Sequence, residues 1–83
     1  MSENDLEKEI ISIISDVSGF DVEEITLETN LANDLEIDSI KAIEITVAIE
    51  KKYKISIRDE DIPNIVAVKD SIEAARNLIA QKE

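Results

Sequence analysis

The chain contains no cysteine and no histidine among its 83 residues. Without cysteine it has neither a disulfide framework nor thiolate chemistry. Without histidine it lacks the commonest general base and the commonest metal ligand. Most nucleophilic and metal-dependent catalysis is therefore excluded for a chain that acts alone, and we expect neither an enzyme nor a metal site.

Glycine and aromatic residues are nearly as scarce. Gly19 is the only glycine, which excludes a glycine-rich phosphate loop, a Rossmann fingerprint and an EF-hand. Phe20 and Tyr53 are the only aromatic residues, so aliphatic side chains must fill the small core that a chain of this length can build. We expect a single domain that covers residues 1–83.

Long apolar runs are also missing. No run approaches the roughly 18 residues needed to cross a bilayer, and the acidic start has neither the basic nor the apolar region of a signal peptide. We therefore expect a cytoplasmic protein without stable membrane insertion.

Positive charge is in short supply, because nine basic residues face 20 acidic ones and the formal net charge is -11. Such a chain repels phosphate backbones and anionic membranes, which excludes nucleic acid as a natural partner. The same charge speeds encounter with proteins that carry basic patches. We expect a monomer that meets basic protein partners.

Helical periodicity begins near the start of the chain. Apolar residues recur at spacings of three and four from about Asn4 to Val17, which predicts an amphipathic helix that Gly19 caps. Between Phe20 and Ile37 the periodicity is lost, and scattered apolar residues indicate a long ordered loop that is pinned to the core.

A second helix is predicted from Ser39 to about Tyr53, with apolar residues on two faces rather than one. One face consists of Ala42, Ile45, Ile49 and Tyr53, and the other of Ile40, Ile43 and Val47. The first face suits the core. The second is either a docking strip with charged edges or a face that is buried because the helix is central, and composition leaves both open.

The rest of the chain predicts one short helix and one long one. Residues 54–58 are interpreted as loop, and residues 59–62 as one acidic helical turn that stops near Pro63. The last helix is expected from Val68 to about Ala80, with Asn64 or Asp70 as its cap. The predicted fold is therefore all-α, a small four-helix bundle of three main helices and one short helix, with a long loop between the first two.

Ser39 is the most informative polar residue because it follows Asp38 at the start of the second helix. Asp38 is a good N-cap candidate, and a capping pair is the ordinary explanation of such a sequence. A nucleophilic role for Ser39 would need an adjacent base, and Lys41 lies about 200° away around a helix. An anion attached to Ser39 would be stabilised there, since a helix start carries unpaired N–H groups and partial positive charge.

The residues around Ser39 carry a recognisable pattern, Asp34-Leu35-x-x-Asp38-Ser39-Ile40 followed by x-x-Ile43-Glu44-Ile45. This pattern resembles the signature of the acyl carrier protein family, and the resemblance extends over nearly the whole chain. It implies that Ser39 accepts 4′-phosphopantetheine from a phosphopantetheinyl transferase that uses coenzyme A. The thiol of that arm would carry acyl groups as thioesters.

The resemblance also implies partners, namely the transferase and the enzymes that load and process acyl chains through basic docking patches. The positions that match the docking surface of the family are Asp38, Ile40, Ile43, Glu44, Val47, Glu50 and Asp59. We expect the interior of such a fold to open enough to shelter an acyl chain.

The chain departs from the common family pattern near Ser39. Residues 36–37 are Glu-Ile where glycine is frequent before the Asp-Ser pair, and Lys41 and residues 51–52 replace frequent acids. These changes soften the negative face of the second helix, which leaves primary fatty acid synthesis and specialised lipid or polyketide synthesis both open. The other readings of the chain are an aminoacyl or peptidyl carrier and an unmodified acidic adaptor that binds basic proteins.

Overall fold

A computed structural model describes residues 3–82. The first helix, α1, is Glu3–Ser18, within one residue of the predicted limits at both ends. Gly19 has a φ of 83°, and its N–H donates to the Ser15 carbonyl over 2.9 Å, as expected of a left-handed residue that closes a helix. The predicted stripe is confirmed, since Leu6, Ile10 and Ile14 are buried.

The segment between α1 and α2 is pinned to the core as predicted. Its side chains Ile25, Leu31, Leu35 and Ile37 are all buried. The prediction of a plain loop was incomplete, because the segment contains a 3₁₀-helix, η1, at Val22–Glu24. It also contains an isolated β-bridge between Asn30 and Ala67, whose backbone bonds tie the segment to the chain just before α3.

The second helix, α2, is Ser39–Tyr53, as predicted. Ile45, Ile49 and Tyr53 are buried, which confirms the inner face. Ile40 and Ile43 on the opposite face are exposed. The helix ends where Lys54 adopts the left-handed conformation with a φ of 56°.

The short fourth element, η2, is a 3₁₀-helix at Asp59–Asn64. It ends one residue after Pro63, which agrees with the predicted stop near that residue, but it includes residues 63–64 beyond the predicted turn at 59–62. The two bonds at its ends run from the Asp61 N–H to the Arg58 carbonyl and from the Ile65 N–H to the Ile62 carbonyl. Neither requires a donor on the proline, so the missing N–H of Pro63 does not break the element.

The last helix, α3, is Val68–Lys82. Neither predicted cap accepts from the first N–H groups of the helix, because those of Val68 and Lys69 donate to the carbonyls of Thr29 and Leu27. Asp70 instead fixes the chain just before the helix, since its carboxylate accepts from the N–H groups of Ala67 at 2.9 Å and Val66 at 3.1 Å. These backbone hydrogen bonds lower the pKa of Asp70, the bond from Ala67 most of all.

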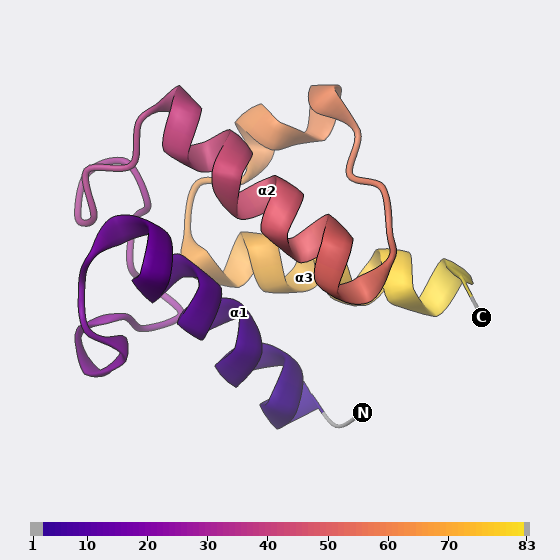
Figure 1. Ribbon diagram of the computed structural model, residues 1–83, viewed down its shortest axis with the longest axis horizontal. Coiled ribbons are helices and arrows are strands. Elements are labelled where there is room, and N and C mark those ends of the chain that lie inside the picture. Colours follow the sequence, from indigo (N-terminus) through magenta and orange to yellow (C-terminus); the bar gives the residue numbers. More distant parts are fainter. Residues whose placement is uncertain (1–2, 83) are drawn as a thin grey trace.

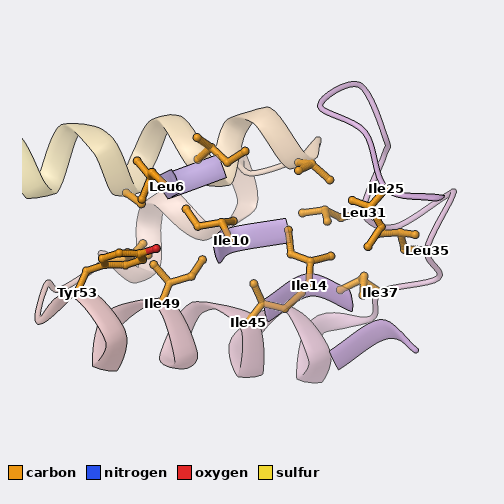
Figure 2. Close-up of a cluster of buried hydrophobic side chains, with 14 residues drawn as sticks. Leu6, Ile10, Ile14, Ile25, Leu31, Leu35, Ile37, Ile45, Ile49 and Tyr53 are labelled. Carbon is orange, nitrogen blue, oxygen red and sulfur yellow. The ribbon is translucent and has the colours of Figure 1, made fainter. Parts of the chain in front are cut away.

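The three helices enclose one aliphatic core. In Figure 1, α2 crosses in front of α3, α1 lies below them, and η2 lies on the side of α2 that faces away from α1. Figure 2 shows Ile10 and Ile14 of α1 pointing toward Ile45 and Ile49 of α2, with the pinned segment closing one end of the core. At the other end the Tyr53 hydroxyl donates to Glu9 Oε1 over 2.6 Å. The predicted all-α architecture is confirmed, and among residues 3–82 the three main helices are joined by two short 3₁₀-helices, η1 and η2, where one short helix was predicted.

Candidate functional site

The start of α2 is fixed by a side-chain cap. Asp38 has extended backbone, and its Oδ1 accepts from the Lys41 N–H over 2.9 Å. Its carbonyl accepts from the Ala42 N–H, which closes the first turn of the helix. The predicted role of Asp38 as N-cap is therefore confirmed.

Ser39 is the first residue of α2, and its side chain is exposed. Within residues 3–82, no hydrogen bond uses the N–H groups of Ser39 and Ile40, because the cap engages only the third N–H of the helix. Two free donors therefore lie beside the serine hydroxyl at the positive end of the α2 dipole. This arrangement fits a phosphate attached to Ser39.

The chain before Ser39 is fixed in place by a left-handed turn and by one buried side chain. Glu36 has a φ of 55°, in the left-handed region that favours glycine, and this turn directs the chain toward the helix start. Ile37 is buried, and its N–H donates to the Leu31 carbonyl over 2.9 Å. The sequence signal for this turn was the glycine common near this position in the family, but the residue pattern alone did not predict a left-handed glutamate.

A cavity of about 370 Å³ opens beside Ser39 between α2, η2 and the start of α3. Its walls are mostly aliphatic and include Leu31, Ile37, Ile45, Ile49, Ile57, Ile62 and Ile65. A shallower hollow of about 420 Å³ adjoins it on the outer side of α2 and also reaches Ser39. A group attached to this serine therefore has an apolar space within reach, as the resemblance led us to expect.

The outer stripe of α2, defined as Ile40, Ile43 and Val47, lies on the surface. Their side chains are 69%, 53% and 38% exposed. Glu44 lies on the same side of the helix and is also exposed. The two readings left open by composition are thus decided in favour of an accessible apolar strip with an acidic edge.

Glu50 differs from the other predicted docking residues because it is half-buried. Its Oε2 accepts from the Ile57 N–H over 2.7 Å, so the carboxylate holds the 54–58 loop against α2. Sequence reasoning missed this structural role, since only the folded loop brings Ile57 near Glu50. The side chain of Asp59 lies outside the part of the chain that the structure describes, and its docking role stays a prediction.

The surroundings of Ser39 show no catalytic group bonded to its hydroxyl among the described residues. Among residues 3–82, no hydrogen bond joins the Ser39 hydroxyl to a carboxylate or an amine. No cluster of three potential metal ligands was found among the same residues.

The sequence matches the family model described as "Phosphopantetheine attachment site" over residues 8–75. It is similar to the acyl carrier protein of Petrotoga mobilis, at 29% identity over 99% of this chain and 92% of that protein. It is also 35% identical to an acyl carrier protein of Rickettsia bellii over 83% of this chain and 85% of that protein. A meromycolate extension acyl carrier protein of Mycobacterium tuberculosis is 39% identical over 83% of this chain and 60% of its own length.

Two solved structures have a fold similar to that of this chain. The apo doublet acyl carrier protein from prodigiosin biosynthesis superposes with a TM-score of 0.77 and 26% identity, over 89% of this chain and 36% of that chain. The acyl carrier protein from Enterococcus faecalis gives a TM-score of 0.79 at 24% identity, over 94% and 99% of the two chains. Within residues 3–82, no helix is both long enough and apolar enough to span a membrane.

Proposed function

Because this chain belongs to the acyl carrier protein family, whose members hold a covalently attached 4′-phosphopantetheine, we propose that Ser39 bears the arm. The observation that carries the proposal is the geometry of the helix start. The hydroxyl is exposed, two backbone N–H groups beside it are free, and a cavity opens at the same point. The arm supplies the terminal thiol that the chain lacks, and acyl groups are carried on it as thioesters.

Attachment requires a partner enzyme, since the protein is a carrier and not a catalyst. Ser39 Oγ forms a bond to the β-phosphorus of coenzyme A, and the phosphoanhydride bond breaks with adenosine 3′,5′-bisphosphate as the leaving group. The proton of the hydroxyl passes to a base of the transferase, because no base in the described structure is bonded to Ser39. The N–H groups of Ser39 and Ile40 then face the new phosphodiester.

The cavity favours an acyl cargo over an aminoacyl or peptidyl one. Its walls are dominated by isoleucine, and a chain of methylene groups gains free energy by leaving water for such a surface. A charged amine would lose far more hydration free energy there than a neutral chain would. We place the protein in fatty acid synthesis or in specialised lipid or polyketide synthesis, and its relatives include carrier proteins named for meromycolate extension and for prodigiosin biosynthesis.

The outer stripe of α2 supports a docking role. Three exposed aliphatic side chains form a continuous strip next to Ser39, and Glu44 adds negative charge beside it. A partner with an apolar contact surrounded by lysine and arginine would be complementary to it. The transferase and the acyl-processing enzymes are the partners we propose, with Asp38, Glu50 and Asp59 at the edges of the contact.

Mass spectrometry of the protein after incubation with a phosphopantetheinyl transferase and coenzyme A tests the attachment site. We expect the wild type to gain the mass of one 4′-phosphopantetheine group and Ser39→Ala to gain none, with unchanged helicity. Ser56→Ala, which removes another exposed hydroxyl, is the matched control and should be modified like the wild type. No gain on the wild type with several transferases, or a gain that persists in Ser39→Ala, would overturn the proposal.

A further inference from the structure

Two hydroxyl groups interrupt the aliphatic wall of the cavity beside Ser39. Thr46 lies on α2 and Ser71 lies in the first turn of α3, and both line the cavity. They are 7% and 3% exposed, so each is buried among apolar neighbours. Valine and alanine would give the cavity nearly the same shape without burying a polar atom.

Each hydroxyl already uses its proton. Thr46 Oγ1 donates to the Ala42 carbonyl over 2.8 Å, and Ser71 Oγ donates to the Val68 carbonyl over 2.7 Å. Both acceptors lie on the same helix as the donor, three or four residues earlier. Bonds of this kind allow a hydroxyl to be buried but slightly destabilise a helix rather than stabilise it.

The oxygen atoms keep their lone pairs. Within residues 3–82, no donor reaches Thr46 Oγ1 or Ser71 Oγ. A hydroxyl oxygen has two acceptor positions, and both residues line the cavity. The cavity is therefore apolar in general but offers hydrogen-bond acceptors on two walls.

From this pattern we infer that the cavity selects an acyl chain that bears a hydroxyl group, an inference that rests on the proposed carrier function. A hydroxyl on the chain donates to Thr46 Oγ1 or Ser71 Oγ and fills an acceptor position inside the cavity. A saturated chain brings no donor and leaves these acceptor positions empty. A ketone brings only an acceptor, so a wall hydroxyl must give up its bond to the helix in order to meet it.

The test compares acyl forms of one protein that differ by a single oxygen. Octanoyl groups that are unsubstituted, hydroxylated at carbon 3, 5 or 7, or oxidised to a ketone at carbon 3 are loaded from their coenzyme A thioesters, and thermal unfolding of each form is measured. We expect at least one hydroxylated form to melt about 4–8 °C above the octanoyl form, the shift that one added hydrogen bond gives in a domain of this size. The ketone form should melt no higher than the octanoyl form.

The variants Thr46→Val and Ser71→Ala identify the acceptor. Each comparison is made between acyl forms of the same variant, so a change in its intrinsic stability cancels. The extra stabilisation should disappear in at least one variant. The inference is overturned if no hydroxylated form exceeds the octanoyl form in the wild type, or if the advantage persists in both variants. Mass spectrometry separates the two proposals, because failure to load would refute the carrier site, whereas loading without preference refutes only the hydroxyl selectivity.

Discussion

The two faces of α2 carry the same kind of side chain and have opposite surroundings. On the inner face Ile45 and Ile49 are 3% and 1% exposed, whereas on the outer face Ile40 and Ile43 are 69% and 53% exposed. The inner isoleucines pack against α1, as Figure 2 shows for Ile14 and Ile45. The outer ones face water beside the proposed attachment residue.

This difference in burial separates residues that stabilise the fold from residues that are available to a partner. Full burial of an isoleucine side chain stabilises the folded state by about 1.5–3 kcal/mol, and an exposed one contributes little. The outer stripe is therefore not explained by the stability of the isolated domain. A contiguous apolar strip that folding does not need is typical of a surface that meets a partner.

The largest expected effect comes from truncating the inner face. Ile49→Ala should lower the free energy of unfolding by about 2–5 kcal/mol, because it removes buried atoms and leaves a cavity. Ile43→Ala is the matched change on the outer face and should alter it by less than about 0.5 kcal/mol. Urea unfolding followed by circular dichroism measures both. Similar losses in the two variants would remove the distinction between the faces.

Tyr53, on the inner face, makes the free energy of unfolding depend on pH. Burial raises its pKa, and the hydrogen bond to Glu9 and the charge of Glu9 raise it further. Because the folded state holds the phenol neutral, its contribution is fully present below the unfolded pKa of 10.0 and is lost as the pH rises above it. Stability should fall by about 1.4 kcal/mol per pH unit above that value.

The matched control for this prediction is Tyr53→Phe. The difference in unfolding free energy between wild type and variant should shrink above pH 10 and stay constant below it. As this is the only tyrosine, the absorbance of tyrosinate should rise together with the loss of helicity. Titration of the phenol in the folded protein at its ordinary pKa would contradict the prediction.

A smaller loss of stability is expected when the N-cap of α2 is removed, because the cap fixes the start of the helix that carries both faces. Asp38→Ala should lower the free energy of unfolding by about 1 kcal/mol, because the Lys41 N–H loses its acceptor. Asp38→Asn keeps an oxygen at the same position and should restore most of the loss. Thermal unfolding of the three proteins measures this, and equal stability of Asp38→Ala and the wild type would show that the cap contributes nothing.

The smallest effect on stability is expected at Glu44, where only association should change. Glu44→Lys should slow binding to the transferase several-fold at low salt and little at high salt, since an exposed charge steers encounter through a screened field. Glu73→Lys makes the same change in net charge at an exposed position on α3, and it should slow binding less. Equal slowing by both variants, or slowing that is independent of salt, would refute a specific role for Glu44.

The residue pattern predicted those parts of the fold that depend on local signals. The three long helices follow from apolar spacing, Gly19 marks the end of α1, and Asp38 caps α2 through its own first turn. These features depend on neighbours within a few residues. The identity of Ser39 as the residue to examine also came from local sequence.

The features that the pattern missed depend on contacts between distant segments. Exposure of the outer stripe depends on which surfaces the loop and η2 cover. The spacing of apolar residues along α2 carries no information about that. The bond from the Ile57 N–H to Glu50 exists only after the loop folds back on α2. η2 continues through Pro63 because the hydrogen bonds at its ends are donated by the N–H groups of Asp61 and Ile65, and neither bond needs a donor on the proline.

The most direct test of the separation between the faces measures modification and melting on the same samples. We predict that Ile43→Glu lowers kcat/KM of the transferase about tenfold or more, a loss typical of a residue at the centre of an interface. The Tm of this variant should stay within about 2 °C of the wild type. Val22→Glu adds the same charge at another exposed apolar position, 49% exposed in η1, and should be modified at the wild-type rate. Wild-type modification of Ile43→Glu, or an equal loss in Val22→Glu, would contradict the account.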